Sequence, residues 1–399
     1  MIQFFMFVNH FVAQKDSFLP MTQLWSFYLP QFHPIPENDR WWGSGFTEWT
    51  NVKTAKPQFP GHYQPHQPDS GLGYYDLREP EVMVRQAALA REYGIHGFVF
   101  YHYWFEGQRL LEKPVASILE NEHFKMPFCL CWANENWSRR WDGMDDDVLM
   151  HQTYSETDDL AHIRELIPFF KDERYFKHQG RPVVLVYRSE DLPDPEQTAG
   201  LWRREVRKAG FKDIYLLRVE GITDAIDPVR HGFDAAVEFA PDWRCLTRQV
   251  YIDKHGHWCD ESDIAEAGSL SNRVFLYEDI MQAMLAKEEP AYKRYSCVFP
   301  AWDNTARRQK LSSTIIYGGS PERFRHFLAE VVRRTRKKFA ADDRLVFINA
   351  WNEWGEGCHL EPDLHDGFGF LQATRAVLQS DRNLPDRIIS WWRTLFRKN

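Results

Sequence analysis

The alternation of short apolar segments with amphipathic segments constrains this chain more than any other feature. Eight apolar runs are each followed by a helical pattern. Strands that alternate with helices indicate β-α-β units and a parallel sheet, and eight such units predict a closed (β/α)8 barrel of the TIM type with long βα loops. The expected strands are residues 24–30, 97–104, 128–133, 182–187, 214–219, 235–239, 296–300 and 345–350.

The helical segments complete the α/β pattern. They are expected at residues 80–93, 110–121, 157–170, 195–209, 224–231, 277–287, 321–339 and 370–378. An open, doubly wound sheet is the alternative, but no glycine-rich phosphate loop follows the first strand. The 399 residues fit one barrel with insertions. We therefore expect a single domain over residues 21–380, preceded by an extension at 1–20 and followed by an amphipathic helix at 381–399.

Charge and cysteine content exclude several classes of function. With 49 basic and 57 acidic residues the net charge is −8, which argues against a nucleic-acid partner. The six cysteines show no paired C-x-x-C spacing, so neither a disulfide framework nor a zinc site is expected, and a reducing compartment fits. No metal or other cofactor is predicted. Residues 1–13 do not resemble a signal peptide, and no apolar run is long enough to span a membrane. The expected location is the cytoplasm.

The last residues have a composition of their own. The segment from Pro385 to Lys398 predicts an amphipathic helix with a cationic face. Such a helix is typical of proteins that bind an anionic membrane surface, here the inner membrane where glycans are assembled. Packing of its apolar side against the barrel is the alternative.

In barrels of this type the active site lies at the carboxyl ends of the strands. Polar and aromatic residues gather there in this sequence, and the long connection after the first strand is rich in both. Flat rings cover the apolar faces of sugars, so this composition predicts a carbohydrate cleft. The substrate-binding candidates are Tyr28, His33, Trp42, Glu48, Trp49, Tyr101, Tyr103, Trp132, Asn134, Glu135, Trp137, Arg139, Arg140, Trp302, Asp303, Asn352, Trp354, His359 and Glu361.

Two glutamates follow the last strand and are the catalytic candidates. Glu353 and Glu356 converge only if the chain turns between them, and Gly355 and Gly357 permit such a turn. Glycoside cleavage requires one carboxyl group as acid and another as base or nucleophile. The alternative is structural, with one of them capping a helix or pairing with an arginine such as Arg307.

Other acids and arginines at the strand ends leave two readings open. Glu135 can be a third acid or can form a salt bridge with Arg139 or Arg140. The same arginines are suited to hold a phosphate or a sugar carboxylate, because guanidinium binds planar oxyanions through two bonds.

Four motifs resemble the WbsX-type proteins, also described as glycoside hydrolase family 99-like. They are F-Y-L-P-Q-F-H-P-I-P-E-N-D-R-W-W-G-S-G-F-T-E-W-T-N-V, L-C-W-A-N-E-N-W-S-R-R-W-D-G, P-A-W-D-N-T-A-R-R and I-N-A-W-N-E-W-G-E-G-C-H-L-E-P-D. The resemblance covers roughly residues 24–378. It implies a (β/α)8 barrel related to the endo-α-mannosidases and a place among bacterial surface-polysaccharide genes.

The resemblance also implies roles for the two glutamates. The family 99 motif N-E-W-H-E-G matches N-E-W-G-E-G here, with Gly355 in place of histidine. Glu353 would deprotonate the substrate 2-hydroxyl, which attacks the anomeric carbon and forms a 1,2-anhydro sugar. Glu356 would act as acid and then as base, with net retention.

The implied function is a retaining glycoside hydrolase acting on mannose-like linkages of O-antigen or capsule, with an oligo- or polysaccharide as substrate. Two alternatives remain at this stage. One is a glycosyltransferase or transglycosylase in lipopolysaccharide or polysaccharide biosynthesis. The other is a non-catalytic glycan-binding barrel.

Overall fold

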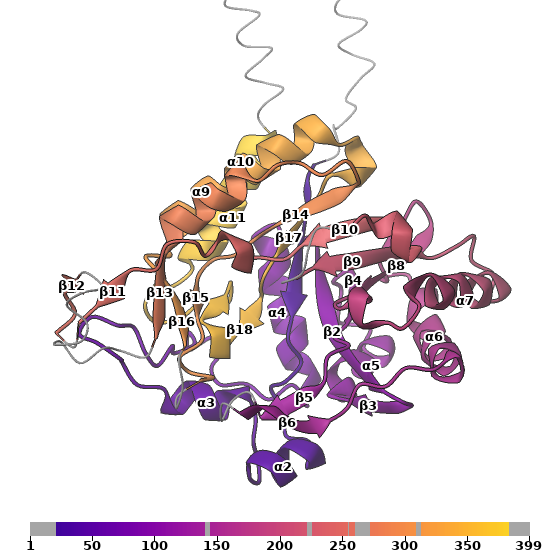
Figure 1. The fold of residues 1–399 in the computed structure, drawn as a ribbon, viewed down its shortest axis with the longest axis horizontal. Coiled ribbons are helices and arrows are strands. Elements are labelled where there is room, and N and C mark those ends of the chain that lie inside the picture. Colours follow the sequence, from indigo (N-terminus) through magenta and orange to yellow (C-terminus); the bar gives the residue numbers. More distant parts are fainter. Residues whose placement is uncertain are drawn as a thin grey trace, which may run out of the picture.

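The eight expected strands form one closed parallel barrel (Figure 1). The computed structural model describes residues 21–139, 144–221, 226–253, 255–259, 272–308 and 313–382. The barrel closes because the first strand pairs with both the second and the last. Its strands are β1 (Gln23–Tyr28), β2 (Gly97–Phe105), β4 (Phe128–Trp132), β8 (Arg181–Val186), β9 (Tyr215–Glu220), β10 (Ala235–Glu238), β14 (Arg294–Val298) and β17 (Leu345–Ile348).

The strands are buried on both faces, which explains their nearly unbroken apolar sequence. All residues of β2, β4 and β17 are buried. The closing register places Trp25 of β1 opposite Gly97 on one side and Phe347 on the other. The fold class and single-domain barrel predicted from the sequence are therefore confirmed.

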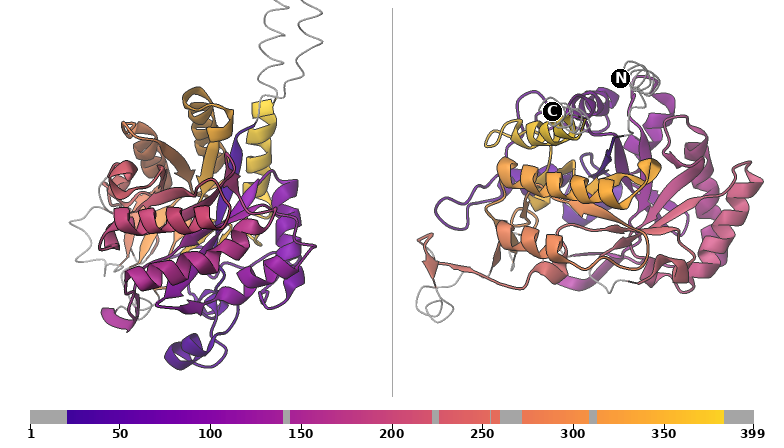
Figure 2. Two further views of the ribbon diagram at one scale, coloured as in Figure 1. Left: turned by 90° about the vertical axis from the view of Figure 1, so that its right-hand side faces the viewer. Right: turned by 90° about the horizontal axis from the view of Figure 1, so that it is seen from above.

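Helices surround the barrel (Figure 2). They are α4 (Pro80–Glu92), α5 (Glu112–Glu120), α6 (Glu156–Lys171), α7 (Pro195–Lys208), α9 (Tyr277–Ala286), α10 (Pro321–Lys338) and α11 (Gly369–Arg382). Local sequence fixes their starts. The Ser320 side chain accepts from the backbone N–H of Arg323 and Pro321 takes the first turn, while Ser155 caps α6 in the same way. The segment expected as a helix at 224–231 contains a short 3₁₀ turn, Pro228–His231, and residues 222–225 lie outside the described residues.

The long connection after β1 was expected as a loop but contains two short helices, α2 (Pro36–Trp42) and α3 (Glu48–Thr54). Pro36 opens α2, and Thr47 and Thr50 form a reciprocal cap on α3. Together with the hairpin of β5 (Trp137–Arg139) and β6 (Met144–Met150), these helices gather at the lower end of the molecule in Figure 1. The long βα loops are thus largely ordered elements that cover the carboxyl ends of the strands.

Smaller pairings complete the structure around the barrel. β13, β15 and β16 form a separate three-stranded sheet, and β18 pairs with β19 directly after β17. Their bounds, with those of the remaining short strands and 3₁₀ turns, are β3 (Gln108–Leu110), β7 (Lys177–His178), β11 (Tyr251–Ile252), β12 (Trp258–Cys259), β13 (Arg273–Leu276), β15 (Trp302–Asp303), β16 (Thr314–Tyr317), β18 (Asn352–Glu353), β19 (Cys358–His359), η1 (Ser189–Asp191), η3 (Trp243–Cys245), η5 (Ala341–Asp343) and η6 (Trp354–Glu356).

Aromatic rings fill the barrel interior. Phe27 of β1 lies at the centre, with ring centroids 5.6 Å from Tyr101, 6.1 Å from Phe239 and 6.1 Å from Phe347. Tyr187 lies 5.5 Å from Phe239 and 6.2 Å from Tyr101. This layer closes the barrel below the strand ends and provides an apolar floor for whatever binds above it.

The ends of the chain fall mostly outside the description. The expected extension at 1–20 and residues 383–399 lie outside the described residues, and α11 itself runs to Arg382. Membrane contact by the C-terminal segment therefore stays a prediction. Among the described helices, none combines the length and apolar character that crossing a bilayer requires.

A substitution at Gly97 tests the closing register. A Cβ placed there would lie 2.2 Å from the fully buried ring of Trp25. We expect Gly97→Ala to lower the free energy of unfolding by about 1–3 kcal/mol, because the packed indole cannot move away. Chemical denaturation followed by circular dichroism measures it. Gly200→Ala is the matched control: it lies inside α7 with its nearest neighbour at 3.6 Å, so it should stabilise by up to about 1 kcal/mol. Equal effects of the two changes would contradict the described packing.

Candidate active site

A cavity of about 450 Å³ lies at the carboxyl ends of the barrel strands. Residues that follow several different strands line it, as expected for an active site in this fold. The aromatic floor of the barrel contributes Tyr101, Tyr187 and Phe239. The lining also contains Leu29, Gln31, Asn38, Trp41, Trp42, Tyr103, Ala133, Glu135, Asn136, Trp137, Ser138, Leu149, Arg188, Trp243, Arg273, Trp302, Asn304, Arg307, Arg308, Thr314, Glu353 and Glu356.

Two aromatic groups wall the cavity. Trp137 packs edge-on against Trp41 at 5.9 Å and against Tyr103 at 5.2 Å. On another part of the lining, Trp243 and Trp302 pack edge-on at 5.1 Å. Edge-to-face packing fixes ring orientation while leaving a face available to a bound molecule. The cavity therefore offers flat apolar surfaces next to charged groups.

Arg307 joins three glutamates at the inner end of the cavity. Its Nη1 donates to Glu356 at 2.6 Å, and its Nη2 donates to Glu353 at 2.8 Å. Its Nη2 and Nε both donate to one oxygen of Glu48, at 2.7 and 2.9 Å. Among the described residues, the two catalytic candidates thus share a single guanidinium and lie side by side. The structural alternative, a pairing with Arg307, is therefore present, and this pairing leaves the catalytic role a prediction.

The turn after β17 brings the acids together. Asn352 and Glu353 form β18, the chain then makes the 3₁₀ turn η6 over Trp354–Glu356, and Gly357 follows with a φ of +57°. The left-handed conformation at Gly357 returns the chain to β19. Gly355 is needed for a different reason. A Cβ there would lie 1.8 Å from Glu48 Oε1, so only glycine lets the Glu48 carboxylate reach Arg307.

The pKa values of both catalytic candidates are raised, chiefly by burial. The pKa of the Glu356 carboxyl is raised to about 8, chiefly by burial, with Arg307 opposing and Glu353 and Glu48 adding to the rise. Burial likewise raises the pKa of Glu353, against the effect of Arg307. At neutral pH the pair suits acid–base chemistry, with Glu356 as the proton carrier.

The structure brings eight of the predicted site residues to the cavity. These are Trp42, Tyr101, Tyr103, Glu135, Trp137, Trp302, Glu353 and Glu356. Eleven others do not line the cavity and lie behind its wall: Tyr28, His33, Glu48, Trp49, Trp132, Asn134, Asp303, Asn352, Trp354, His359 and Glu361. The side chain of Arg139 and all of Arg140 lie outside the described residues.

Some of these residues hold the acidic turn in place. The Asn352 side chain accepts from Leu29 N–H at 2.8 Å and donates to Leu29 C=O at 3.0 Å, which joins the turn to the end of β1. Glu361 accepts from the indole N–H of Trp354 and from Gln86, both at 2.6 Å, and from Tyr75 at 2.9 Å. Their position indicates a supporting role rather than contact with a ligand.

Glu135 pairs with an arginine that its immediate sequence does not indicate. Its carboxylate accepts from Nε and Nη2 of Arg188, at 2.8 and 2.6 Å. Asn134 fixes that arginine through the backbone: it accepts from Arg188 N–H and donates to Arg188 C=O, both at 2.8 Å. The charged pair therefore sits on the cavity wall in a fixed place.

Sequence reasoning did not select several residues that line the cavity as site residues, among them Trp41, Tyr187, Arg188 and Trp243, and it named Arg307 only as a structural partner of the glutamates. Each follows a barrel strand closely or lies in the connection after one. Their position after a strand was therefore predictable from the sequence. The direction of each side chain was not, because the short helices and sheets above the barrel decide it.

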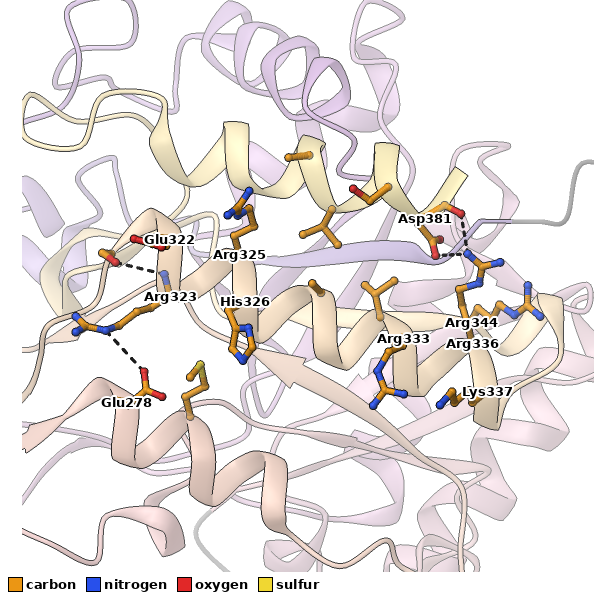
Figure 3. A pocket seen from close by; sticks show the side chains of 17 residues that line it. Glu278, Glu322, Arg323, Arg325, His326, Arg333, Arg336, Lys337, Arg344 and Asp381 are labelled. Atoms are coloured by element: carbon orange, nitrogen blue, oxygen red, sulfur yellow. Dashed lines mark hydrogen bonds and ion pairs between the residues drawn. The ribbon is translucent and has the colours of Figure 1, made fainter. Parts of the chain in front are cut away.

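A larger hollow of about 1130 Å³ lies elsewhere on the molecule, beside α9, α10 and α11 (Figure 3). It lies on the outside of the barrel, between the helices, and among the described residues it shares no lining residue with the cavity at the strand ends. Two of its acids are paired, Glu278 with Arg323 and Asp381 with Arg336, and Glu322 in its lining is exposed. This hollow does not have the chemistry of an acid–base site.

The family model described as "Glycosyltransferase WbsX" matches residues 24–374. Two relatives, both called "Uncharacterized protein WxcX" and both from Xanthomonas campestris pv. campestris, are 43% (strain B100) and 44% (strain ATCC 33913) identical over 386 residues. The alignment covers 95% of this chain and 53% of each relative, so the chain spans about half the length of the curated relatives it matches.

Solved structures share the fold at low sequence identity. A "Glycoside hydrolase-like protein" superposes with a TM-score of 0.54 and 12% identity, covering 90% of this chain and 94% of that one. The GH99 endo-α-mannosidase from Bacteroides thetaiotaomicron superposes with a TM-score of 0.53 and 13% identity, covering 91% and 98%. This likeness shows that the barrel fold is shared, and it does not identify a reaction.

A double-mutant cycle tests the contact between Gly355 and Glu48. We expect Gly355→Ala to destabilise the protein, because its Cβ would overlap the Glu48 carboxylate. In a Glu48→Ala background the same change should cost less, with a coupling of about 0.5–3 kcal/mol. Unfolding free energies of the four proteins measure the coupling. Additive costs would show that Glu48 does not occupy the space beside Gly355.

Proposed function

The chain belongs to the WbsX family, and from that premise we propose that it is a retaining glycoside hydrolase acting on mannose-like linkages of a bacterial surface polysaccharide. The observation that carries the proposal is the pair Glu353 and Glu356, held by one guanidinium at the inner end of an aromatic-walled cavity. The likeness in fold to an endo-α-mannosidase supports the choice of sugar.

The proposed acid is Glu356. With its pKa raised to about 8, it carries a proton at neutral pH and can deliver that proton to the oxygen of the leaving group. Its Oε1 accepts from Arg307, which leaves Oε2 to hold the proton. In the second half of the reaction the ionised carboxylate takes a proton from the incoming water, which restores the starting state.

The proposed base is Glu353. Arg307 contributes positive charge that opposes the rise of its pKa, so this carboxyl ionises more readily than burial alone would allow. It takes the proton of the substrate 2-hydroxyl as that oxygen attacks the anomeric carbon. The glycosidic bond breaks as the 1,2-anhydro ring forms. Water later opens the ring at the anomeric carbon, and Glu353 returns its proton to the 2-oxygen. Two inversions give net retention, and no atom of the protein bonds to the sugar.

The cavity walls fit a sugar ring. The indoles of Trp137 and Trp302 and the phenol of Tyr103 provide flat apolar surfaces, and Glu135 and Asn304 provide polar groups beside them. Carbohydrates present apolar C–H faces with hydroxyl groups at the rim, so this mixture supports a glycan substrate.

Transfer of a sugar is the second candidate, favoured by the description of the family model and by the arginines in the cavity lining. Arg188, Arg273, Arg307 and Arg308 are chemically suited to a diphosphate. Calorimetry with a nucleotide-sugar and with a mannose-configured iminosugar separates the two functions. The hydrolase proposal expects heat from the iminosugar and none from the nucleotide-sugar, and the reverse result would favour transfer.

Amide substitutions test the assignment of the two acids. We expect Glu353→Gln and Glu356→Gln each to reduce kcat/KM by roughly 10²–10⁴-fold on an α-mannose-containing oligosaccharide that the protein cleaves. Glu322→Gln, at an exposed position in the first turn of α10, is the control and should leave turnover unchanged. A 2-deoxy analogue of the same substrate should resist cleavage, because it lacks the attacking hydroxyl. Cleavage of that analogue at a comparable rate would exclude participation of the 2-hydroxyl.

The pKa shifts predict a bell-shaped dependence of kcat/KM on pH. Glu356 must be protonated, so activity should fall as pH rises through about 8. Glu353 must be ionised, and its raised pKa places the acidic limb above the ordinary range of a glutamate. Rates of the wild-type protein across the pH range give both limbs. The residual activity of Glu356→Gln should lose the alkaline limb, and an unchanged limb in that variant would assign it to another group.

A further inference from the structure

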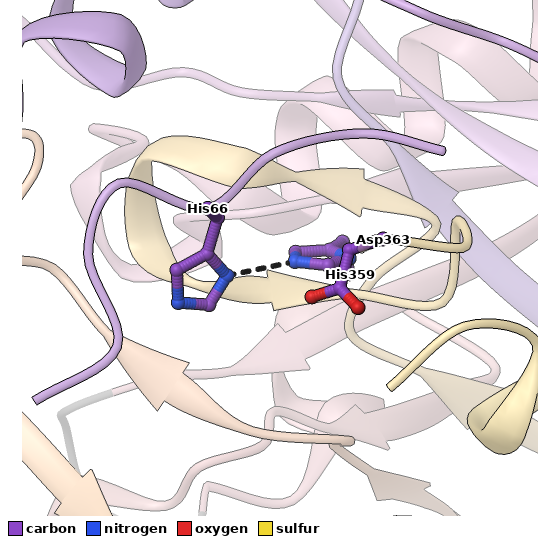
Figure 4. Close-up of side chains that lie close together, drawn as sticks. All are labelled: His66, His359 and Asp363. Atoms are coloured by element: carbon purple, nitrogen blue, oxygen red, sulfur yellow. Dashed lines mark hydrogen bonds between the residues drawn. The ribbon is translucent and has the colours of Figure 1, made fainter. Parts of the chain in front are cut away.

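His66, His359 and Asp363 converge behind the acidic turn, outside the cavity (Figure 4). One nitrogen or oxygen from each side chain lies within 4.8 Å of the others, and all three residues are buried. The nearest pair is His66 Nδ1 and His359 Nε2, at 2.9 Å. The three come from two distant segments, which explains why no spacing in the sequence indicates the cluster.

The hydrogen bond on the far side of His359 fixes which nitrogen faces the cluster. Its Nδ1 lies 2.9 Å from the backbone C=O of Glu361, and a carbonyl oxygen only accepts. Nδ1 therefore carries the proton, and Nε2 presents a lone pair to His66. A backbone carbonyl that holds one ring nitrogen so that the other points at a shared centre is the usual support of a metal-binding histidine.

Two carboxylates, Asp363 in the cluster and Asp303, are buried. Among the described residues neither forms an ion pair with a lysine or an arginine. Asp303 accepts from His62, Gln64 and the backbone N–H of Thr305, and Asp363 accepts from two backbone N–H groups. Within the described part of the chain, Gln64 Oε1 is buried and has no hydrogen-bond partner. Buried carboxylates without a lysine or arginine partner favour a bound cation.

From this geometry we propose that His66, His359 and Asp363 bind a divalent transition-metal ion with a structural role. Two nitrogens 2.9 Å apart, each about 2.1 Å from one ion, subtend an angle of about 90° at that ion. This is the angle between neighbouring ligands in octahedral coordination. Two imidazoles and one carboxylate on one face suit iron, cobalt or nickel better than magnesium or calcium, which prefer oxygen ligands throughout.

The ion would join two segments that already pair through their backbones. Asp69 N–H donates to Pro362 C=O, and Leu364 N–H donates to Gln67 C=O. His359 is also the strand partner of Asn352, one residue before the proposed base. A metal at this place would therefore hold the segment from His66 to Asp69 against the β18–β19 hairpin, which carries Glu353, and would limit the movement of that hairpin.

Cobalt titration of the full chain, stripped of metal by a chelator, tests the proposal. We expect one Co²⁺ per chain with visible absorption bands in the protein complex, a rise in Tm, and no rise with Mg²⁺ at the same concentration. His66→Asn and Asp363→Asn should weaken Co²⁺ binding by about tenfold or more. Asp363→Asn keeps a side-chain oxygen for the two backbone N–H groups, so it tests binding without breaking that turn.

His123→Gln, at an exposed position remote in sequence from all three ligands, controls for loss of a histidine and should bind Co²⁺ as the wild type does. These readouts do not use activity, so their outcome is independent of the proposed reaction. If the stripped protein gives no cobalt absorption bands and no change in Tm, or if both ligand variants bind Co²⁺ as tightly as the wild type, the cluster is a hydrogen-bonded histidine pair and the proposal is wrong.

Discussion

Arg307 holds three glutamates, two of them buried and Glu356 half-buried, and the arrangement of the site depends on this one guanidinium. Glu48, Glu353 and Glu356 all accept from it, although Glu48 is 259 residues away in sequence. One positive charge cannot balance three carboxylates in a buried place, so the cluster favours uptake of a proton. Glu356 is the most exposed of the three, so a proton on its carboxyl is the one that a bound molecule can reach. The acid of the proposed reaction therefore follows from charge balance as much as from its place in the turn.

The same cluster explains the departure from the family 99 motif at Gly355. A side chain at this position would occupy the space that the Glu48 carboxylate fills. Glu48 in turn is held at the first turn of α3, whose start is fixed by the cap at Thr47. Gly355 in the acidic turn and Glu48 in the long connection after β1 therefore depend on each other, because the Glu48 carboxylate fits only where position 355 has no side chain. Together they place a third carboxylate beside Arg307.

The barrel could be predicted from the sequence because its strands are buried on both faces and follow one another in regular order. Each short apolar run with a helix behind it has a single role in such a fold. The strand ends gave the neighbourhood of the site for the same reason. Side-chain direction was not predictable, since α2, α3 and the β13–β16–β15 sheet are short elements fixed by contacts far apart in sequence. Trp41 and Trp42 are adjacent and both line the cavity, whereas Trp49, seven residues beyond Trp42, turns inward and packs 5.4 Å from Trp354.

The acidic motif is long because most of its residues build the turn. Asn352 joins the turn to β1, Trp354 stacks on His359 at 3.7 Å, and Glu361 holds the Trp354 indole N–H. Only Glu353 and Glu356 of this stretch reach the cavity. Such a motif specifies where two carboxyl groups stand, and the rings of Trp41, Trp137 and Trp302, which come from other loops, shape the space beside them. The position of the acids depends on the same loops as those rings, because Glu48 lies with Trp41 in the connection after β1 and Arg307 lies with Trp302 after β14.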